Sequence, residues 1–200
     1  LKVTTKPGAQ SFAEEQGKAS WGIIWLQLIA LGVFGTIIGL LRTLMGTALV
    51  FGAGSSSAST SIALFEGVFA GSASVAAIIG VIVGFFILVG IQYLLAKAFG
   101  GNGSFMQQGY NYLLFYVPLT AVSYVVGLIP VLGGIIGRVL WVYGIVLNVF
   151  SIQAAHRMSG GKATAVVLIP YAILFVLFFL CAILIVAVLF ASLHGATTTP

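Results

Sequence analysis

Charged side chains are the scarcest feature of this chain. Its 200 residues include eight basic and three acidic ones, which is 6%, against about 25% in a typical soluble domain. The mean hydropathy is +1.20, and 60% of the residues are hydrophobic. A water-soluble protein of this composition would expose large apolar areas and aggregate. The composition therefore excludes a soluble globular protein and predicts a single membrane domain.

The residue types that perform most catalysis are nearly absent as well. They comprise only His156, His194, Glu14, Glu15, Glu66 and Cys181. A single cysteine excludes an intrachain disulfide. So few ligands and bases, spread over distant segments, provide neither a metal site nor a catalytic triad. We therefore expect no enzymatic activity and no cofactor.

Uncharged gaps divide the chain into lengths that can cross a membrane. A helix needs about 20 apolar residues to span the hydrocarbon core. Five segments meet this requirement, namely residues 21–41, 72–96, 108–129, 134–155 and 163–193. The sequence thus predicts an all-α, polytopic membrane protein. Its bundle of five transmembrane helices occupies residues 21–193, between a cytoplasmic juxtamembrane segment at 1–20 and a disordered tail at 194–200.

Short interfacial helices are predicted before the first and the second span. Ser11 and Glu14 have the spacing of a capping box, so a short helix is expected over residues 11–19. Residues 43–71 contain a Gly, Ala, Ser and Thr tract at 52–61 that is typical of a flexible linker. Neither apolar flank of this tract approaches 20 residues. We therefore expect one or two short interfacial helices there, and a sixth, very short span is the less favoured alternative.

The basic residues predict the orientation in the membrane. With a cytoplasmic N-terminus, the cytoplasmic cations are Lys2, Lys6, Lys18, Lys97, Arg157 and Lys162, and those outside are Arg42 and Arg138. An excess of six over two follows the positive-inside rule and leaves the C-terminus extracytoplasmic. Because the net charge of +5 is scattered at span ends, we expect membrane lipids as its partner and no nucleic acid.

Glycines spaced four residues apart indicate close helix contacts. The chain has 26 glycines, and the pairs within or beside spans are Gly35 with Gly39, Gly80 with Gly84, and Gly133 with Gly137. Small residues at this spacing let helices approach each other closely in lipid. The pairs predict helix packing, either inside the bundle or between two copies.

The third predicted span is unusually polar. Its polar residues recur every four positions at Gln108, Tyr112, Tyr116, Thr120 and Tyr124, and the fourth span adds Asn148 and Ser151. We expect Tyr112, Tyr116 and Asn148 to face the interior of the bundle. Interhelical hydrogen bonds are the favoured explanation, and a polar cavity or permeation path is the second. No carboxylate lies deep in a span, which argues against proton- or cation-coupled transport.

Two short loops form the predicted cytoplasmic surface. They supply the residues expected to dock a partner or anionic lipid, which are Lys97, Phe105, His156, Arg157 and Lys162. A basic residue near an anionic leaflet is attracted by about 1 kcal/mol, so lipid contact alone could account for the charges. Docking of a protein partner is the alternative.

The same loops resemble a known family. The resemblance rests on residues 95–105 (LAKAFGGNGSF), Tyr110, Pro118, the Ile129-Pro130 pair, Trp141 and residues 153–163 (QAAHRMSGGKA). In order and spacing they are similar to the Yip domain, the membrane module of the Ypt-interacting-protein family. This resemblance covers roughly the last two-thirds of the chain, with a weaker match at Ser20 and Trp21.

The resemblance implies a five-helix membrane protein with a cytoplasmic N-terminus. Eukaryotic members of the family are associated with Rab-type small GTPases and with vesicle traffic between endoplasmic reticulum and Golgi. This chain departs from them by its short N-terminal region, so it looks like a prokaryotic member. A small GTPase is accordingly a partner by family resemblance alone.

Together these features predict a non-enzymatic integral membrane protein of the Yip type. It would organise membrane or recruit partners through its cytoplasmic loops, and self-association or contact with other membrane proteins is expected. One alternative is an accessory subunit of a larger membrane complex. Another is a small channel or carrier that uses the polar third and fourth spans.

Overall fold

The computed structural model describes residues 2–52, 57–129 and 131–196, with the backbone alone for residues 2, 46–52, 57–75, 77 and 187–196. Three short helices come first: α1 (Lys2–Thr5), α2 (Ala9–Glu15) and the 3-10 helix η1 (Gln16–Lys18). Five long helices follow: α3 (Trp21–Gly52), α4 (Ser57–Ala98), α5 (Phe105–Val126), α6 (Leu132–His156) and α7 (Gly160–Ala196). Over these ranges no strand occurs, which confirms the all-α fold class.

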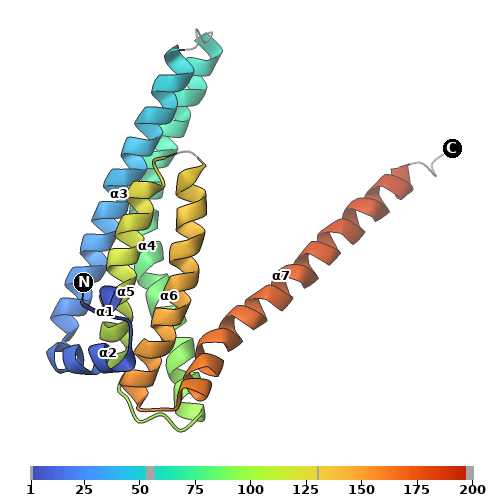
Figure 1. Ribbon diagram of the computed structural model, residues 1–200. Coiled ribbons are helices and arrows are strands. Elements are labelled where there is room, and N and C mark those ends of the chain that lie inside the picture. The colour runs from blue at the N-terminus through green and yellow to red at the C-terminus, as the bar shows by residue number, and fades with distance from the viewer. Residues whose placement is uncertain (1, 53–56, 130, 197–200) are drawn as a thin grey trace.

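Helices α3 to α6 stand side by side as a bundle, and α7 leaves it at an angle (Figure 1). The chain turns from α4 to α5 and from α6 to α7 at one end of the bundle, where α3 also begins. We call this the loop end. Helix α5 contacts α3, α4 and α6, so it is the central helix of the bundle.

Four stretches are long and apolar enough to cross a membrane in the part of the chain that the structure describes. They are Trp21–Met45, Ile78–Ala98, Leu132–His156 and Gly160–Val186. They overlap the predicted spans 21–41, 72–96, 134–155 and 163–193. The remaining predicted span, 108–129, corresponds to α5 and is not among the four. The chain is thus a multi-pass helical membrane protein with four candidate spans, and the fifth stays a prediction.

The polarity of α5 follows from its central position. Gln108 and Asn111 lower its hydropathy, yet their side chains are only 1% and 0% exposed. Their polar atoms therefore face protein and not lipid, where an unpaired polar group would cost several kcal/mol, about as much as in any apolar medium. A helix that is enclosed by protein in this way can be less hydrophobic than a helix that faces lipid.

The prediction of short interfacial helices between the first two spans is wrong. Residues 43–52 continue α3 and residues 57–71 continue α4 without a break, so neither described stretch forms a separate interfacial helix. Residues 53–56 of the predicted linker lie outside the described residues. Extending an existing helix adds one hydrogen bond per residue, whereas starting a new one is unfavourable, so the flanks of the tract join the adjoining helices.

The predicted tail at 194–200 is corrected for a similar reason. Helix α7 runs through Ala196, so residues 194–196 are helical. Residues 197–200 lie outside the described residues.

A short helix before the first span is confirmed, but it starts elsewhere. Helix α2 begins at Ala9 after Gly8, and Ser11 lies inside it. The hydroxyl of Ser11 donates to the carbonyl of Lys6 at 2.9 Å and does not cap the helix. The segment also packs on the bundle, because the hydroxyl of Tyr143 on α6 donates to the carbonyl of Thr4 at 2.8 Å.

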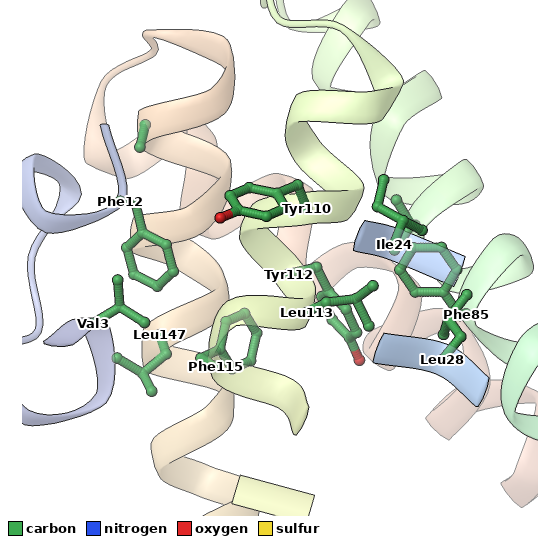
Figure 2. Close-up of a cluster of buried hydrophobic side chains, with 12 residues drawn as sticks. Val3, Phe12, Ile24, Leu28, Phe85, Tyr110, Tyr112, Leu113, Phe115 and Leu147 are labelled. Atoms are coloured by element: carbon green, nitrogen blue, oxygen red, sulfur yellow. The ribbon is translucent and has the colours of Figure 1, made fainter. Parts of the chain in front are cut away.

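The hydrophobic core joins the N-terminal segment to the loop-end half of the bundle. Figure 2 shows Val3 and Phe12 beside Leu147 and Phe115, and Tyr112 in the same cluster. The Phe12 ring is 0% exposed and meets the Phe115 ring edge-on at 6.1 Å between centroids. Residues 3–19 are therefore part of the folded core.

The predicted packing glycines differ in their surroundings. A Cβ at Gly35 would lie 2.8 Å from Cε2 of Tyr124 on α5, so α3 and α5 approach closely there. Gly133 is crowded by the backbone of Val126 and Gly127, where α5 turns into α6. At the other four predicted glycines, Gly39, Gly80, Gly84 and Gly137, a Cβ would meet no atom of the described residues within 4 Å. Contact with a second copy stays a prediction for them.

Substitution of Gly35 by alanine is expected to lower the free energy of unfolding by about 1–2 kcal/mol, because the Tyr124 ring must shift to admit the methyl group. Gly39→Ala, one turn later on the same helix, is the matched control. It should be neutral or stabilising by up to about 1 kcal/mol, because alanine favours a helix over glycine. Unfolding of the purified protein by increasing dodecyl sulfate, followed by circular dichroism, measures both. Equal stability of the two variants would refute close packing at Gly35.

Candidate functional site at the loop end

Two loops meet at the loop end. Residues 99–104 join α4 to α5, and residues 157–159 join α6 to α7. The backbone N–H of Asn102 donates to the carbonyl of His156 at 3.3 Å, and the ammonium of Lys162 donates to the carbonyl of Phe99 at 3.2 Å. We call residues 99–104 and 156–159 the loop clasp, because hydrogen bonds hold its two parts together.

His156 lies at the centre of the loop clasp. Its side chain is 1% exposed. Nδ1 accepts a hydrogen bond from the backbone N–H of Gly103 at 3.2 Å, and Nε2 lies 2.8 Å from Oε1 of Gln108. Since Nδ1 accepts, Nε2 must carry the proton and donate to Gln108, so the ring is neutral in this arrangement. The amide of Gln108 in turn donates to the carbonyl of Val89 at 3.1 Å, and the chain of bonds links α6, α5 and α4.

The glycines of the first loop make room for this ring. A Cβ at Gly101 would lie 2.7 Å from Nδ1 of His156, and a Cβ at Gly103 would overlap the carbonyl of Ala155. Gly100 has a φ of +87°, in the left-handed region that glycine adopts without steric cost. The run Gly100-Gly101-Asn102-Gly103 is therefore explained by a close approach of backbone to side chain.

Local signals set the helix ends around the clasp. Ser104 and Gln107 form a capping box, in which the Ser104 hydroxyl accepts from the N–H of Gln107 at 3.2 Å and the Gln107 amide oxygen accepts from the N–H of Ser104 at 3.1 Å. Two N–H groups that a helix start leaves unpaired are thereby satisfied. At the end of α6, Arg157 takes a left-handed conformation with a φ of 51°, which turns the chain into the second loop.

Three of the five predicted docking residues are exposed cations at the loop end: Lys97, Arg157 and Lys162. The ammonium of Lys97 lies 5.5 Å from the centre of the Tyr93 ring, which is cation–π geometry. Nearby, Lys18 pairs with Glu15 at 2.6 Å, and this hydrogen bond raises the pKa of Lys18.

The other two predicted docking residues have different surroundings. The prediction for His156 is wrong, since a ring that is buried under the first loop cannot contact a partner. Phe105 is half-buried, and its ring packs on those of Trp21 at 6.0 Å, Phe86 at 6.1 Å and Tyr93 at 5.6 Å. Phe105 thus anchors the start of α5, and the predicted docking residues that remain exposed are the three cations.

A polar interior continues from the clasp into the bundle. The amide nitrogen of Asn148 on α6 donates to Oε1 of Gln92 on α4 at 3.3 Å, an interhelical hydrogen bond of the predicted kind. Tyr112 is buried and stacks on the half-buried Tyr116 at 5.0 Å between ring centroids. Sequence reasoning missed Gln92, although a lone glutamine in an apolar run is itself a signal of a buried polar contact.

Several atoms of this interior have no hydrogen-bond partner within the described chain. They include Oδ1 of Asn148, Nε2 of Gln92, Oγ of Ser151 and both side-chain polar atoms of Asn111. Buried polar atoms are paired in most proteins. The polar interior therefore has hydrogen-bonding capacity beyond what its helices use. Among the described residues, no three His, Cys, Asp or Glu side chains group to hold a metal ion.

Comparison with known proteins gives one match. The family model of the Yip1 domain matches residues 1–183, which include the short N-terminal helices, the loop clasp and the polar interior. No curated protein and no solved structure matches the chain.

Proposed function

This chain belongs to the Yip1 domain family, and from that premise we propose that it is a non-enzymatic integral membrane protein that recruits an acidic partner through its loop end. The observation that carries the proposal is the exposure of three cations, Lys97, Arg157 and Lys162. They lie on or beside the loop clasp, which hydrogen bonds hold in place. Cations that are held in place lose less conformational entropy when they bind than cations on free loops.

The two ends of the bundle differ in a way that supports a cytoplasmic loop end. Lys97, Arg157 and Lys162 belong to the loop end, whereas the guanidinium of Arg42 donates to the carbonyl of Gly127 at 2.6 Å, where α5 ends. The excess of exposed cations at the loop end matches the side that the positive-inside rule assigns to the cytoplasm. A partner would then approach from the cytoplasm, and a small GTPase is one candidate by family membership.

Anionic lipid is the competing explanation of these charges. Attraction to an anionic leaflet depends on the number of charges, at about 1 kcal/mol each, and little on their geometry. A protein interface depends on both, because arginine forms planar, paired hydrogen bonds that lysine does not. A substitution that changes the residue type but keeps the charge therefore distinguishes attraction to lipid from a protein interface.

The triple variant Lys97→Gln, Arg157→Gln, Lys162→Gln is expected to reduce co-purification of the partner by about tenfold or more. The reason is the loss of three cations from the docking face at little cost to the buried contacts of the clasp. Gentle native extraction followed by mass spectrometry measures the yield of partner per copy of this protein. Arg138→Gln, on the opposite half of α6, is the control and should leave the yield unchanged.

A second variant preserves the charge and changes the geometry: Lys97→Arg, Arg157→Lys, Lys162→Arg. If this variant keeps every co-purifying molecule and the triple glutamine variant loses them, the three cations act through attraction to anionic lipid. An unchanged partner yield in the glutamine variant would sink the docking proposal. A companion present in fixed ratio regardless of these charges would instead identify a host complex of which this chain is an accessory subunit.

A further inference from the structure

A cavity of about 460 Å³ lies between α4, α5, α6 and α7. Its polar lining consists of Tyr112, Tyr116, Thr120, Ser123, Asn148 and Tyr171. Its apolar wall includes Leu88, Phe115, Leu119, Leu140 and Trp141. The lining runs from Gly137 to Asn148 along α6, about 17 Å at 1.5 Å per residue. This size and this mixture of lining groups are typical of a binding site for a small molecule.

Asn148, one of the side chains that line the cavity, has an unsatisfied polar atom. Asn148 is 2% exposed, and its amide nitrogen is engaged with Gln92. Its Oδ1 has no hydrogen-bond partner in the described chain. A buried oxygen in this state is unfavourable, so an occupant that donates a hydrogen bond to it would be stabilised. Ser123, in the part of the cavity away from Asn148, already donates to the carbonyl of Leu119 at 2.9 Å.

The charge of the lining restricts the occupant. None of the residues that line the cavity in the described chain is acidic, basic or a histidine. A phosphate or an ammonium group placed there would lack a counter-charge in a medium of low dielectric constant, which is strongly unfavourable. The occupant must therefore be uncharged, with hydrogen-bonding groups near Asn148 and hydrocarbon along the apolar wall.

The course of α7 leaves the cavity accessible from the bilayer. The rings of Trp141 and Tyr171 meet edge-on at 6.0 Å, and Tyr171 is the residue that α7 contributes to the lining. Beyond it α7 stands away from the bundle, and Ile173 and Leu174 are more than half exposed (Figure 1). A lipid chain can therefore enter between α6 and α7 without crossing the polar surface.

We propose that this cavity binds an uncharged, single-chain lipid with a hydroxyl-bearing head group, the chemistry of a monoacylglycerol. A head-group hydroxyl donates to Oδ1 of Asn148, and the acyl chain lies against Phe115, Leu119 and Trp141. Burial of the acyl chain favours its transfer out of water, but it does not favour transfer from the bilayer to the cavity, because both are apolar. Selection over bulk lipid therefore comes from the head group. The site is separate from the loop clasp and does not depend on the docking function.

Photolabelling of the full chain in phosphatidylcholine vesicles tests the proposal. The probe is a monoacylglycerol with a diazirine in its acyl chain, at low mole fraction, and mass spectrometry locates the label after illumination. We expect label on residues 112–123 of α5 and 137–148 of α6. Unlabelled monoacylglycerol should reduce the labelling of these residues by competition, and an equal amount of phosphatidylglycerol should leave it unchanged.

Two variants fill the cavity. A Cβ at Gly137 would meet no atom of the described residues within 4 Å, and a Cβ at Gly144 would meet Cδ1 of Leu119 at an ordinary 3.6 Å. Gly137→Leu and Gly144→Leu should each reduce specific labelling by about tenfold, because the leucine side chain occupies the space of the probe. Gly134→Leu is the matched control, since its Cβ also meets open space and Gly134 does not line the cavity.

Helical circular dichroism and elution volume show which variants are folded. Unchanged labelling in a folded Gly137→Leu or Gly144→Leu variant would overturn the proposal. Competition by phosphatidylglycerol equal to that by monoacylglycerol would overturn it too, because the head group would then not be selected. The same holds for label spread evenly over α3 and α7, which would indicate bulk lipid.

Discussion

His156→Leu is expected to lower the free energy of unfolding by about 2–4 kcal/mol, although leucine is apolar and of similar size. The substitution leaves the N–H of Gly103 and Oε1 of Gln108 without their partner, and each buried unpaired group costs about 1–3 kcal/mol. The loop clasp would open as a result. Dodecyl sulfate unfolding followed by circular dichroism measures stability, and the rate of tryptic cleavage after Arg157 reports on the clasp.

Gln153→Leu is the matched control for this variant. Gln153 is half-buried one turn earlier on α6, and no hydrogen bond of its side chain occurs in the described part of the chain. His156→Gln should recover part of the stability, because an amide can accept from Gly103 and donate to Gln108. If His156→Leu were as stable and as resistant to trypsin as Gln153→Leu, the hydrogen bonds of the ring would not hold the clasp.

The proposed docking function depends on the same ring, because the ring fixes the positions of the neighbouring cations. His156 precedes Arg157, and the loop that covers it begins at Phe99, whose carbonyl accepts from Lys162. Loss of the ring would leave the three cations present but no longer held. Reduced partner yield in His156→Leu, with all three cations intact, would show that their placement matters as well as their charge.

Phe12→Ala is expected to detach the N-terminal segment from the bundle at a cost of about 3–5 kcal/mol. Phe12 is 0% exposed and its ring contacts that of Phe115 in the core (Figure 2), so truncation leaves a cavity between α2 and the bundle. Limited trypsin digestion measures detachment through cleavage after Lys18. Cleavage should be faster in the variant, and stability in dodecyl sulfate should fall with it.

Gln10→Ala is the control on the same helix, because Gln10 is exposed and its loss leaves no cavity. Phe12→Leu should fall between the two, since it keeps most of the apolar contact. Tryptic cleavage of Phe12→Ala at the rate of the control would mean that the segment is held by other contacts, such as the hydrogen bond from Tyr143 to Thr4.

The short N-terminal helices also bear on whether α5 spans the membrane. Helix α1 and η1 contact α5, and α2 contacts α6. Together with α3, α4 and α6 they surround the polar first half of α5, where Gln108 and Asn111 are buried. A helix enclosed in this way can lie at membrane depth without exposing its amides to lipid. Detachment of the segment in Phe12→Ala would remove part of that cover.

Several features could be predicted from the sequence because they depend on composition alone. Apolar runs near Trp21, Leu132 and Gly160 predicted helices there, and the structure confirms them. The polar residues at every fourth position of α5 face different helices, as their spacing requires. A spacing of four drifts by about 40° per step, and Gln108 contacts His156 on α6 whereas Tyr124 contacts Gly35 on α3.

The errors share a physical cause. In lipid, a glycine on a helix surface has the same sequence context whether it faces another helix or a hydrocarbon chain, so Gly35 and Gly39 could not be told apart. His156 ends a span beside Arg157, a position typical of an exposed residue. Its burial depends on a loop more than 50 residues earlier, whose glycines approach close enough to bond the ring.

What the sequence by itself determined is the medium and the secondary structure. Eleven charged residues in 200 require a membrane, and the distances between them require long helices, because each backbone group in lipid must find its partner within its own helix. What only the tertiary structure decided is which polar groups meet. The clasp around His156, the enclosure of α5 and the cavity at Asn148 each arise from segments distant in the chain, and their hydrogen bonds exist only once the helices have packed.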